Sequence, residues 1–169
     1  ASILPVRALA RCGGTDADVF EGMLWASGVQ IAGVPANQHP ARVINMSLGG
    51  WGACSSAVQE AIDDALAQGA VVVVSAGNAS IDVESFSPAN CGGVITVGGD
   101  ASYRDDTWLS VDNRDVLKQD AFTLVGLFGV YDTPGGTWQL RAGVRNLTDE
   151  LYKTDAQEFS SVGNIQTAY

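Results

Sequence analysis

Hydrophobic positions in the first hundred residues alternate between strand-like and helix-like spacing. Short apolar runs, which are typical of buried strands, occur at 3–9, 43–48, 71–74 and 94–97. Residues 16–29 and the stretch after Ser56 place apolar side chains three and four positions apart, which predicts helices. This alternation predicts a parallel sheet with right-handed crossovers, and the all-valine run at 71–74 suits its fully covered centre.

Local signals mark the ends of the two predicted helices. Thr15 or Asp16 can cap the free amides at the start of the first helix. Ser56 and Gln59 match a capping box at the start of the second. Gly69 is predicted to end the second helix in a left-handed conformation.

The pattern changes near residues 98–100, which predicts an α/β domain at 1–100 and a β-rich domain at 101–169. Strands are predicted at 107–111, 121–131 and 137–144, with a hairpin turn at 132–136 between the last two. The polar stretch 149–158 fits either a helix or a loop. The expected fold class is therefore α/β, a parallel-sheet core extended by appended antiparallel strands.

The net charge, the apolar runs and the cysteines limit which binding partners and which cellular compartment can be expected. A net charge of −10 in 169 residues argues against nucleic acid and anionic membrane as partners, since phosphate binding needs clustered Lys and Arg. No apolar run approaches the roughly 20 residues of a membrane helix, and no signal-peptide pattern is visible, so a soluble protein is expected. Cys12, Cys54 and Cys91 leave three alternatives open, namely one disulfide with a free thiol, metal ligation, or three inert thiols.

Four strings in the first half carry a family resemblance. They are Leu4–Leu9, Val43–Gly50, Ser75–Asn78, and Ser87–Cys91 followed by Val94–Val97. In this order and spacing they make residues 3–100 resemble the interior of a subtilisin-like serine protease. The resemblance implies that Ser47–Gly50 lines the substrate groove and that Asn78 supplies the oxyanion donor. The family's catalytic Asp and His motifs and its Gly-Thr-Ser nucleophile motif do not occur in the chain.

The second half resembles a different family. Tyr103–Asp106 and Gly143–Tyr152 are similar to strings in the C-terminal part of a TonB-dependent outer-membrane receptor. Joined to a protease interior, such a segment predicts a chimera. Both pieces leave strand edges and apolar faces uncovered, so strands intertwined between subunits of a homodimer or higher oligomer are expected, without insertion into a membrane.

Serine proteolysis is not expected from these residues. Ser47, Ser75 and Ser87 have no recognisable base, and loss of triad members costs about 10⁴–10⁶-fold in related systems.

Metal chemistry is the alternative route to hydrolysis. The candidate ligands are His39, Cys54, Cys91, Asp63 and Asp64, residue types that bind zinc or another divalent transition metal. A zinc-bound water with a pKa of about 7 supplies a nucleophile without a triad. The sequence therefore predicts a metal-assisted hydrolase of activated esters or phosphoesters. The alternative hypothesis is a folded oligomeric chimera with no evolved catalytic activity.

Overall fold

The structure is a computed structural model that describes residues 2–79, 82–109, 115–159 and 164–168. Its elements follow in chain order: α1 (Asp16–Ser27), β1 (Val43–Met46), β2 (Gly50–Trp51), α2 (Ser56–Ala67), β3 (Val71–Ser75), η1 (Val83–Ser85), β4 (Phe86–Ser87), β5 (Val94–Arg104), β6 (Thr107–Trp108), η2 (Asp115–Leu117), β7 (Lys118–Gln119), β8 (Phe122–Asp132), β9 (Gln139–Val144), β10 (Asp155–Phe159) and β11 (Asn164–Ala168). The chain divides into two compact units, one of Ala1–Gly98 with Gly129–Ala142, the other of Gly99–Phe128 with Gly143–Tyr169.

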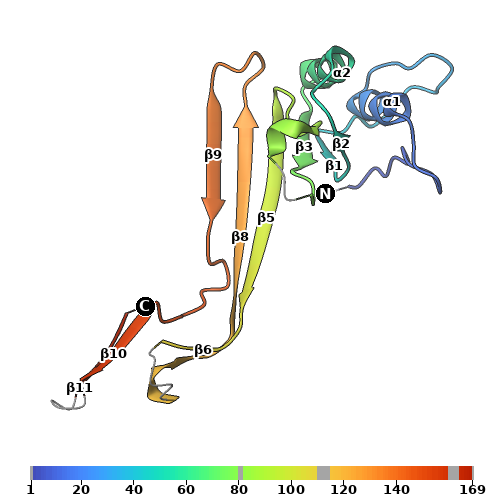
Figure 1. Ribbon diagram of the computed structural model, residues 1–169. Helices are drawn as coiled ribbons and strands as arrows, with labels where there is room; N and C mark the ends of the chain where they lie inside the picture. The colour runs from blue at the N-terminus through green and yellow to red at the C-terminus, as the bar shows by residue number, and fades with distance from the viewer. Residues whose placement is uncertain (1, 80–81, 110–114, 160–163, 169) are drawn as a thin grey trace. The chain divides into compact units, whose positions relative to one another are not determined.

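The largest sheet has five strands in the order β1-β3-β5-β8-β9, shown in Figure 1. Strands β1, β3 and β5 are parallel, with Asn45 opposite Val73 and Val73 opposite Ile95. Strands β8 and β9 run in opposite directions and are joined by the predicted hairpin, where the Thr133 amide donates to the Trp138 carbonyl over 2.9 Å. A mixed α/β sheet with a parallel core is thus confirmed.

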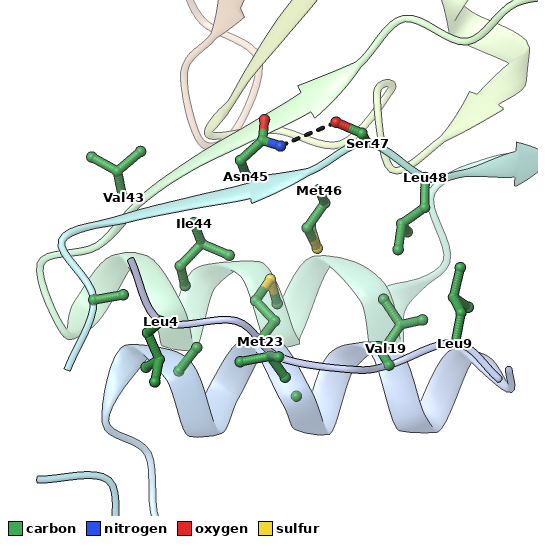
Figure 2. Close-up of a pocket in the computed structure, with 15 residues that line it drawn as sticks. Leu4, Leu9, Val19, Met23, Val43, Ile44, Asn45, Met46, Ser47 and Leu48 are labelled. Atoms are coloured by element: carbon green, nitrogen blue, oxygen red, sulfur yellow. Dashed lines mark hydrogen bonds between the residues drawn. The ribbon is translucent and has the colours of Figure 1, made fainter. Parts of the chain in front are cut away.

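Both helices pack on the same face of the parallel strands. Figure 2 shows Ile44 and Met46 pointing toward the helices, whereas Val43 and Asn45 point away. The hydrophobic core lies between the helices and the sheet. It consists of alternate strand residues and of the inward-facing residues of α1 and α2, such as Ile62 of α2, which is 0% exposed.

The opposite face of the parallel strands remains open among the described residues. Val43, Val71 and Val97 are 62%, 41% and 43% exposed. The valine run 71–74 does lie inside the parallel sheet, between β1 and β5, but the expectation that it is not half-exposed is wrong. Its residues alternate, with Val72 and Val74 buried against the helices and Val71 exposed.

The start of α1 and the end of α2 follow the sequence signals. Thr15 caps α1 in a capping box, accepting from the Asp18 amide at 3.2 Å while the Asp18 carboxylate accepts from the Thr15 amide at 3.0 Å. Gly69 follows α2 with φ of +79°, a left-handed conformation that glycine adopts without steric cost.

The start of α2 differs from the prediction by one residue. Ser55, not Ser56, has the extended backbone of a cap, and its hydroxyl accepts from the Val58 amide at 3.4 Å. The predicted capping box is also wrong, because the Gln59 side chain bonds to Gly92 instead. A long-range partner has replaced the local one.

Other strand predictions need revision. Residues 3–9 form no strand and are largely exposed, although Leu4 and Val6 lie over α1. The strand expected at 94–97 continues to Arg104, whereas the one expected at 107–111 is reduced to Thr107–Trp108, its end reaching residues outside those described. In the polar stretch 149–158, residues 149–154 form a loop, which was one of the two predicted alternatives, and the remaining residues belong to β10.

The second unit has a small cluster of its own. Leu117 is buried, and the Phe122 and Tyr152 rings stack with centroids 4.7 Å apart. The Lys153 amide donates to the Gln119 side-chain oxygen over 2.7 Å. In the part of the chain that the structure describes, no helix has the length and apolarity needed to cross a membrane.

Candidate functional site

A cavity of 310 Å³ lies along the loop that follows β1. One wall is the run Leu48–Ala53, a second is the start of α1 with Asp16 and Phe20, and a third contains Ser87 and Pro88. Three of the four residues 49–52 are glycine, and Trp51 is the exception, so much of this loop's backbone has no side-chain cover. Exposed extended backbone of this kind can hydrogen-bond an added peptide strand.

The groove segment, Ser47–Gly50, lies beside the loop that carries Asn78. The first follows β1 and the second follows β3, and these neighbouring strands are parallel with Met46 opposite Val74. Carboxyl ends of parallel strands meet at one edge of a sheet, which is where open α/β sheets bind ligands. Asn78 is exposed, so its amide is accessible from solvent at that edge.

The third wall of the cavity, which contains Ser87 and Pro88, is held in place by several long-range contacts. β2 pairs with β4 so that Gly50 faces Ser87 and Trp51 faces Phe86. The Asn90 side-chain amide donates to the carbonyls of Gly52 and Glu84, each at 2.9 Å. These bonds fix the 84–90 segment against the loop that lines the cavity.

A disulfide between Cys54 and Cys91 closes the same region, leaving Cys12 as an exposed free thiol. This settles the three alternatives for the cysteines in favour of one disulfide with a leftover thiol. Gln59 of α2 adds two bonds to Gly92, donating to its carbonyl at 3.0 Å and accepting from its amide at 2.8 Å. Sequence reasoning missed these long-range roles of Gln59 and Asn90, since it assigned Gln59 to a local capping box and read Asn90 only as part of the string Ser87–Cys91.

The candidate serines and the single histidine lie at opposite ends of the sheet. Ser47 and Ser75 stand at the carboxyl ends of β1 and β3, and Figure 2 shows the Asn45 amide donating to the Ser47 hydroxyl over 3.0 Å. His39 precedes β1 on an exposed loop, where its amide donates to the Asn37 side chain. The four residues of β1 span about 13 Å, too far for His39 to take a proton from Ser47.

The predicted metal ligands do not gather. Cys54 and Cys91 are consumed by the disulfide, and Asp63 and Asp64 lie on the exposed face of α2, where Asp63 accepts from Gln59 over 2.9 Å. His39 stands on its own loop. Among residues 2–79, 82–109, 115–159 and 164–168, no group of three or more His, Cys, Asp or Glu side chains is placed to hold a metal ion.

The first turn of α1 carries two acidic side chains, Asp16 and Asp18, of which Asp16 lines the cavity. The Thr15 hydroxyl and amide hydrogen-bond to the Asp18 carboxylate and hold the pKa of that carboxyl below its usual range. A negative charge in the first turn also interacts favourably with the helix dipole.

In the second unit, the Lys118 ammonium lies 2.6 Å from the Asp106 carboxylate. Their hydrogen bond lowers the pKa of Asp106 and raises that of Lys118. The pair is exposed to solvent, where such contacts contribute little to stability.

Comparison with known proteins identifies the family. A family model described as the subtilase family matches residues 1–167. The chain is 49% identical over 109 residues to the extracellular protease of Xanthomonas campestris pathovar campestris, covering 61% of this chain and 19% of that protein. It is 48% identical over 98 residues to the extracellular basic protease of Dichelobacter nodosus, covering 58% and 16%. A solved protease structure from Pseudoalteromonas arctica superimposes with a TM-score of 0.56 at 50% identity, covering 57% of this chain and 28% of that one.

These findings correct the functional predictions. The prediction of a metal-assisted hydrolase is wrong, because the chain matches the subtilase family, its relatives are named proteases, and the described residues bring no metal-binding group together. The comparisons point instead to a segment of the subtilase type of serine protease. The family match continues across residues 102–167, and nothing in these comparisons supports a TonB-dependent receptor there.

The chain spans about a fifth of the length of the curated relatives. Within that span Ser47–Gly50 and Ser75–Asn78 lie at one edge of the parallel sheet, and Ser87 of β4 pairs with Gly50. The chain therefore belongs to the subtilase family.

Proposed function

We propose that this chain is the peptide-binding part of a subtilase-type serine protease. In this proposal Ser47–Gly50 pairs with an extended peptide, and the Asn78 amide donates a hydrogen bond to the oxygen of the carbonyl under attack. The observation that carries it is the parallel register of β1 and β3, since it sets both loops at the same sheet edge.

The chemistry supplied by Asn78 is stabilisation of negative charge. A neutral amide aimed at a developing oxyanion is worth about 10²–10³-fold in rate in a serine protease. Base and nucleophile are separate requirements, and the separation of His39 from Ser47 and Ser75 shows that these three do not meet them together. The hydrolytic reaction is proposed for the complete protease of which the present residues form a part.

Two noncovalent probes test the proposal. The first is an acetylated tetra-alanine amide, which has only ground-state carbonyls. The second is the same peptide with one carbonyl replaced by an anionic phosphinate, which mimics the oxyanion. Binding is followed by two-dimensional NMR, which reports on Gly49, Gly50 and the Asn78 side-chain amide separately.

We expect both probes to shift Gly49 and Gly50 and the phosphinate also to shift the Asn78 amide. Asn78→Ala should weaken the phosphinate by about tenfold or more, as expected for a lost hydrogen bond to a charged group. It should leave the tetra-alanine affinity within twofold. A folded protein with an intact disulfide that binds neither probe would refute the proposal.

A self-assembled state is a further proposal. The open face bearing Val43, Val71 and Val97, together with edge strand β9, supports a homodimer or higher oligomer in which a second copy covers apolar surface. Intertwining of strands is one form of it. Light scattering should give a mass of at least twice 17.6 kDa, and a monomeric mass at micromolar concentration would contradict it.

An extracellular location is also proposed. Two relatives are named extracellular proteases, and the Cys54–Cys91 disulfide suits an oxidising compartment. Detection of the protein in culture supernatant, with Cys54 and Cys91 blocked to thiol reagents, would test this.

A further inference from the structure

The ring of Phe86 lies between two glycines that belong to the two loops of the proposed site. Phe86 is 9% exposed and starts β4, where it faces Trp51 of β2. A Cβ built on Gly77 would stand 3.0 Å from two atoms of the ring, Cε1 and Cζ. A Cβ built on Gly49 would overlap Cε1 and would approach the Ser87 carbonyl oxygen to 2.6 Å.

Only glycine permits these contacts. At Gly77 the backbone has φ of +82°, so a side chain there would also be strained. At Gly49 the obstacle is steric, because neither the ring edge nor the Ser87 carbonyl can withdraw easily from a tight strand pair. The outer end of the ring, at Cε1 and Cζ, therefore packs closely against both glycines and limits how near the two loops can come to it.

The ring itself is held firmly. The Phe86 amide donates to the Val83 carbonyl, and the Phe86 carbonyl accepts from the Asn90 amide at 3.0 Å. Beyond Asn90 the chain is tied by the disulfide at Cys91. Movement of the ring is thus opposed by bonds before and after it in the chain.

The two glycines connect the ring to the two parts of the site. Gly49 belongs to the groove segment, and Gly77 immediately precedes Asn78. We propose that Phe86 is a positioning residue, whose ring sets the separation between Ser47–Gly50 and the Asn78 amide. This inference rests on the proposed function, since the separation matters only if one ligand contacts both loops.

Phe86→Leu tests the inference, because leucine keeps an apolar side chain but is shorter and lacks the ring atoms Cε1 and Cζ that pack against the two glycines. We expect the phosphinate probe to lose about tenfold in affinity, because Asn78 no longer reaches the anionic oxygen. Tetra-alanine amide should change by less than twofold, since its contacts are confined to the groove segment. Phe122→Leu, a buried aromatic of the other unit, is the matched control and should leave the ratio of the two affinities unchanged.

A spectroscopic signature separates positioning from general stability. A ring lying against Gly77 should shift its Hα resonance upfield, and this shift should vanish in Phe86→Leu while the Asn78 side-chain amide resonance moves. If Phe86→Leu does not fold, Phe86→Met is the substitute, and the ring-current shift in the unaltered protein can still be measured.

The outcomes are distinguishable. An unaltered protein that binds neither probe refutes the proposed function and, with it, this inference. Probe binding with an unchanged affinity ratio in Phe86→Leu overturns the inference alone, as does a Gly77 resonance without any upfield shift. Equal loss of both probes would also overturn it, because that result marks Phe86 as a residue of general stability.

Discussion

Removal of the Cys54–Cys91 disulfide should strongly destabilise the fold. The bond links residues 37 apart in sequence, closing the loop that contains α2 and β3. In the chain-entropy treatment, a cross-link removes freedom from the unfolded state, by about 3 kcal/mol for a 15-residue loop and about 4.7 kcal/mol for a 100-residue loop. Interpolation gives about 4 kcal/mol for this loop.

Native contacts around Cys91 should increase the loss in free energy of unfolding. Cys91 is 2% exposed and its neighbours Asn90 and Gly92 make the bonds that hold the cavity wall. A serine hydroxyl at Cys91 would therefore place a polar group in a buried position, whereas Cys54 is half-buried beside the Ser55 carbonyl and the Gln59 side chain. The loss in free energy of unfolding should be about 4 kcal/mol or slightly more.

The assay is urea unfolding followed by circular dichroism in a Cys12→Ser background, which prevents disulfide exchange with the exposed thiol. Cys12→Ser alone should unfold as the unaltered protein does. Cys54→Ser with Cys91→Ser should show the predicted loss, and a reducing agent should destabilise the parent by the same amount while leaving the double variant unaffected. An unchanged urea midpoint in the double variant would refute the reasoning, because it would mean that the loop is equally restricted without the bond.

Three further predictions concern the helices. Ser55→Ala should cost about 1 kcal/mol in urea unfolding because it removes the N-cap of α2, whereas Ser56→Ala, the matched control, should cost much less; equal losses would contradict the cap assignment. Ile62→Ala should cost about 2–5 kcal/mol, since Ile62 is 0% exposed, and a cost below 1 kcal/mol would show that its surroundings are not packed. The pKa of Asp18 is lowered in the folded state, so its contribution to the free energy of unfolding should be present above about pH 4 and be lost as the pH falls through the folded value. Asp18→Asn should remove that part of the acid dependence in urea unfolding. An unchanged dependence of stability on pH would contradict the Thr15 capping box.

Much of the fold was predictable because it rests on local signals. The helical spacing around Ile62 and the left-handed Gly69 after α2 depend on residues within one or two turns. The wrong prediction of a capping box at Ser56 shows the limit of local signals. The Gln59 side chain hydrogen-bonds to Gly92, 33 residues away, and not to the backbone amide that a capping box would require. The strand predicted at 3–9 fails similarly, because an apolar run becomes a strand only when a neighbour pairs with it.

The candidate site also combines features that the sequence shows with features that only the fold shows. The strings Ser47–Gly50 and Ser75–Asn78 can be recognised in the sequence, and the parallel register of β1 and β3 places them at the same edge of the sheet. The metal prediction went wrong because ligand-type residues were grouped by chemistry, while the fold places His39 before β1, Asp63 and Asp64 on an exposed helix face, and pairs the two cysteines. Sequence lists which side chains exist, and only long-range packing decides which of them meet.

The sequence by itself determined the parallel α/β core, the helix positions and the loops that resemble a subtilase groove, since each follows from periodicity or from a short string. The tertiary structure alone decided which cysteines pair, which face of the valine strand is covered, and that Phe86 lies between Gly49 and Gly77. These last features join residues 9 to 37 positions apart. Their stabilisation comes from contacts that exist only after the chain has closed the intervening loops, so no local pattern records them.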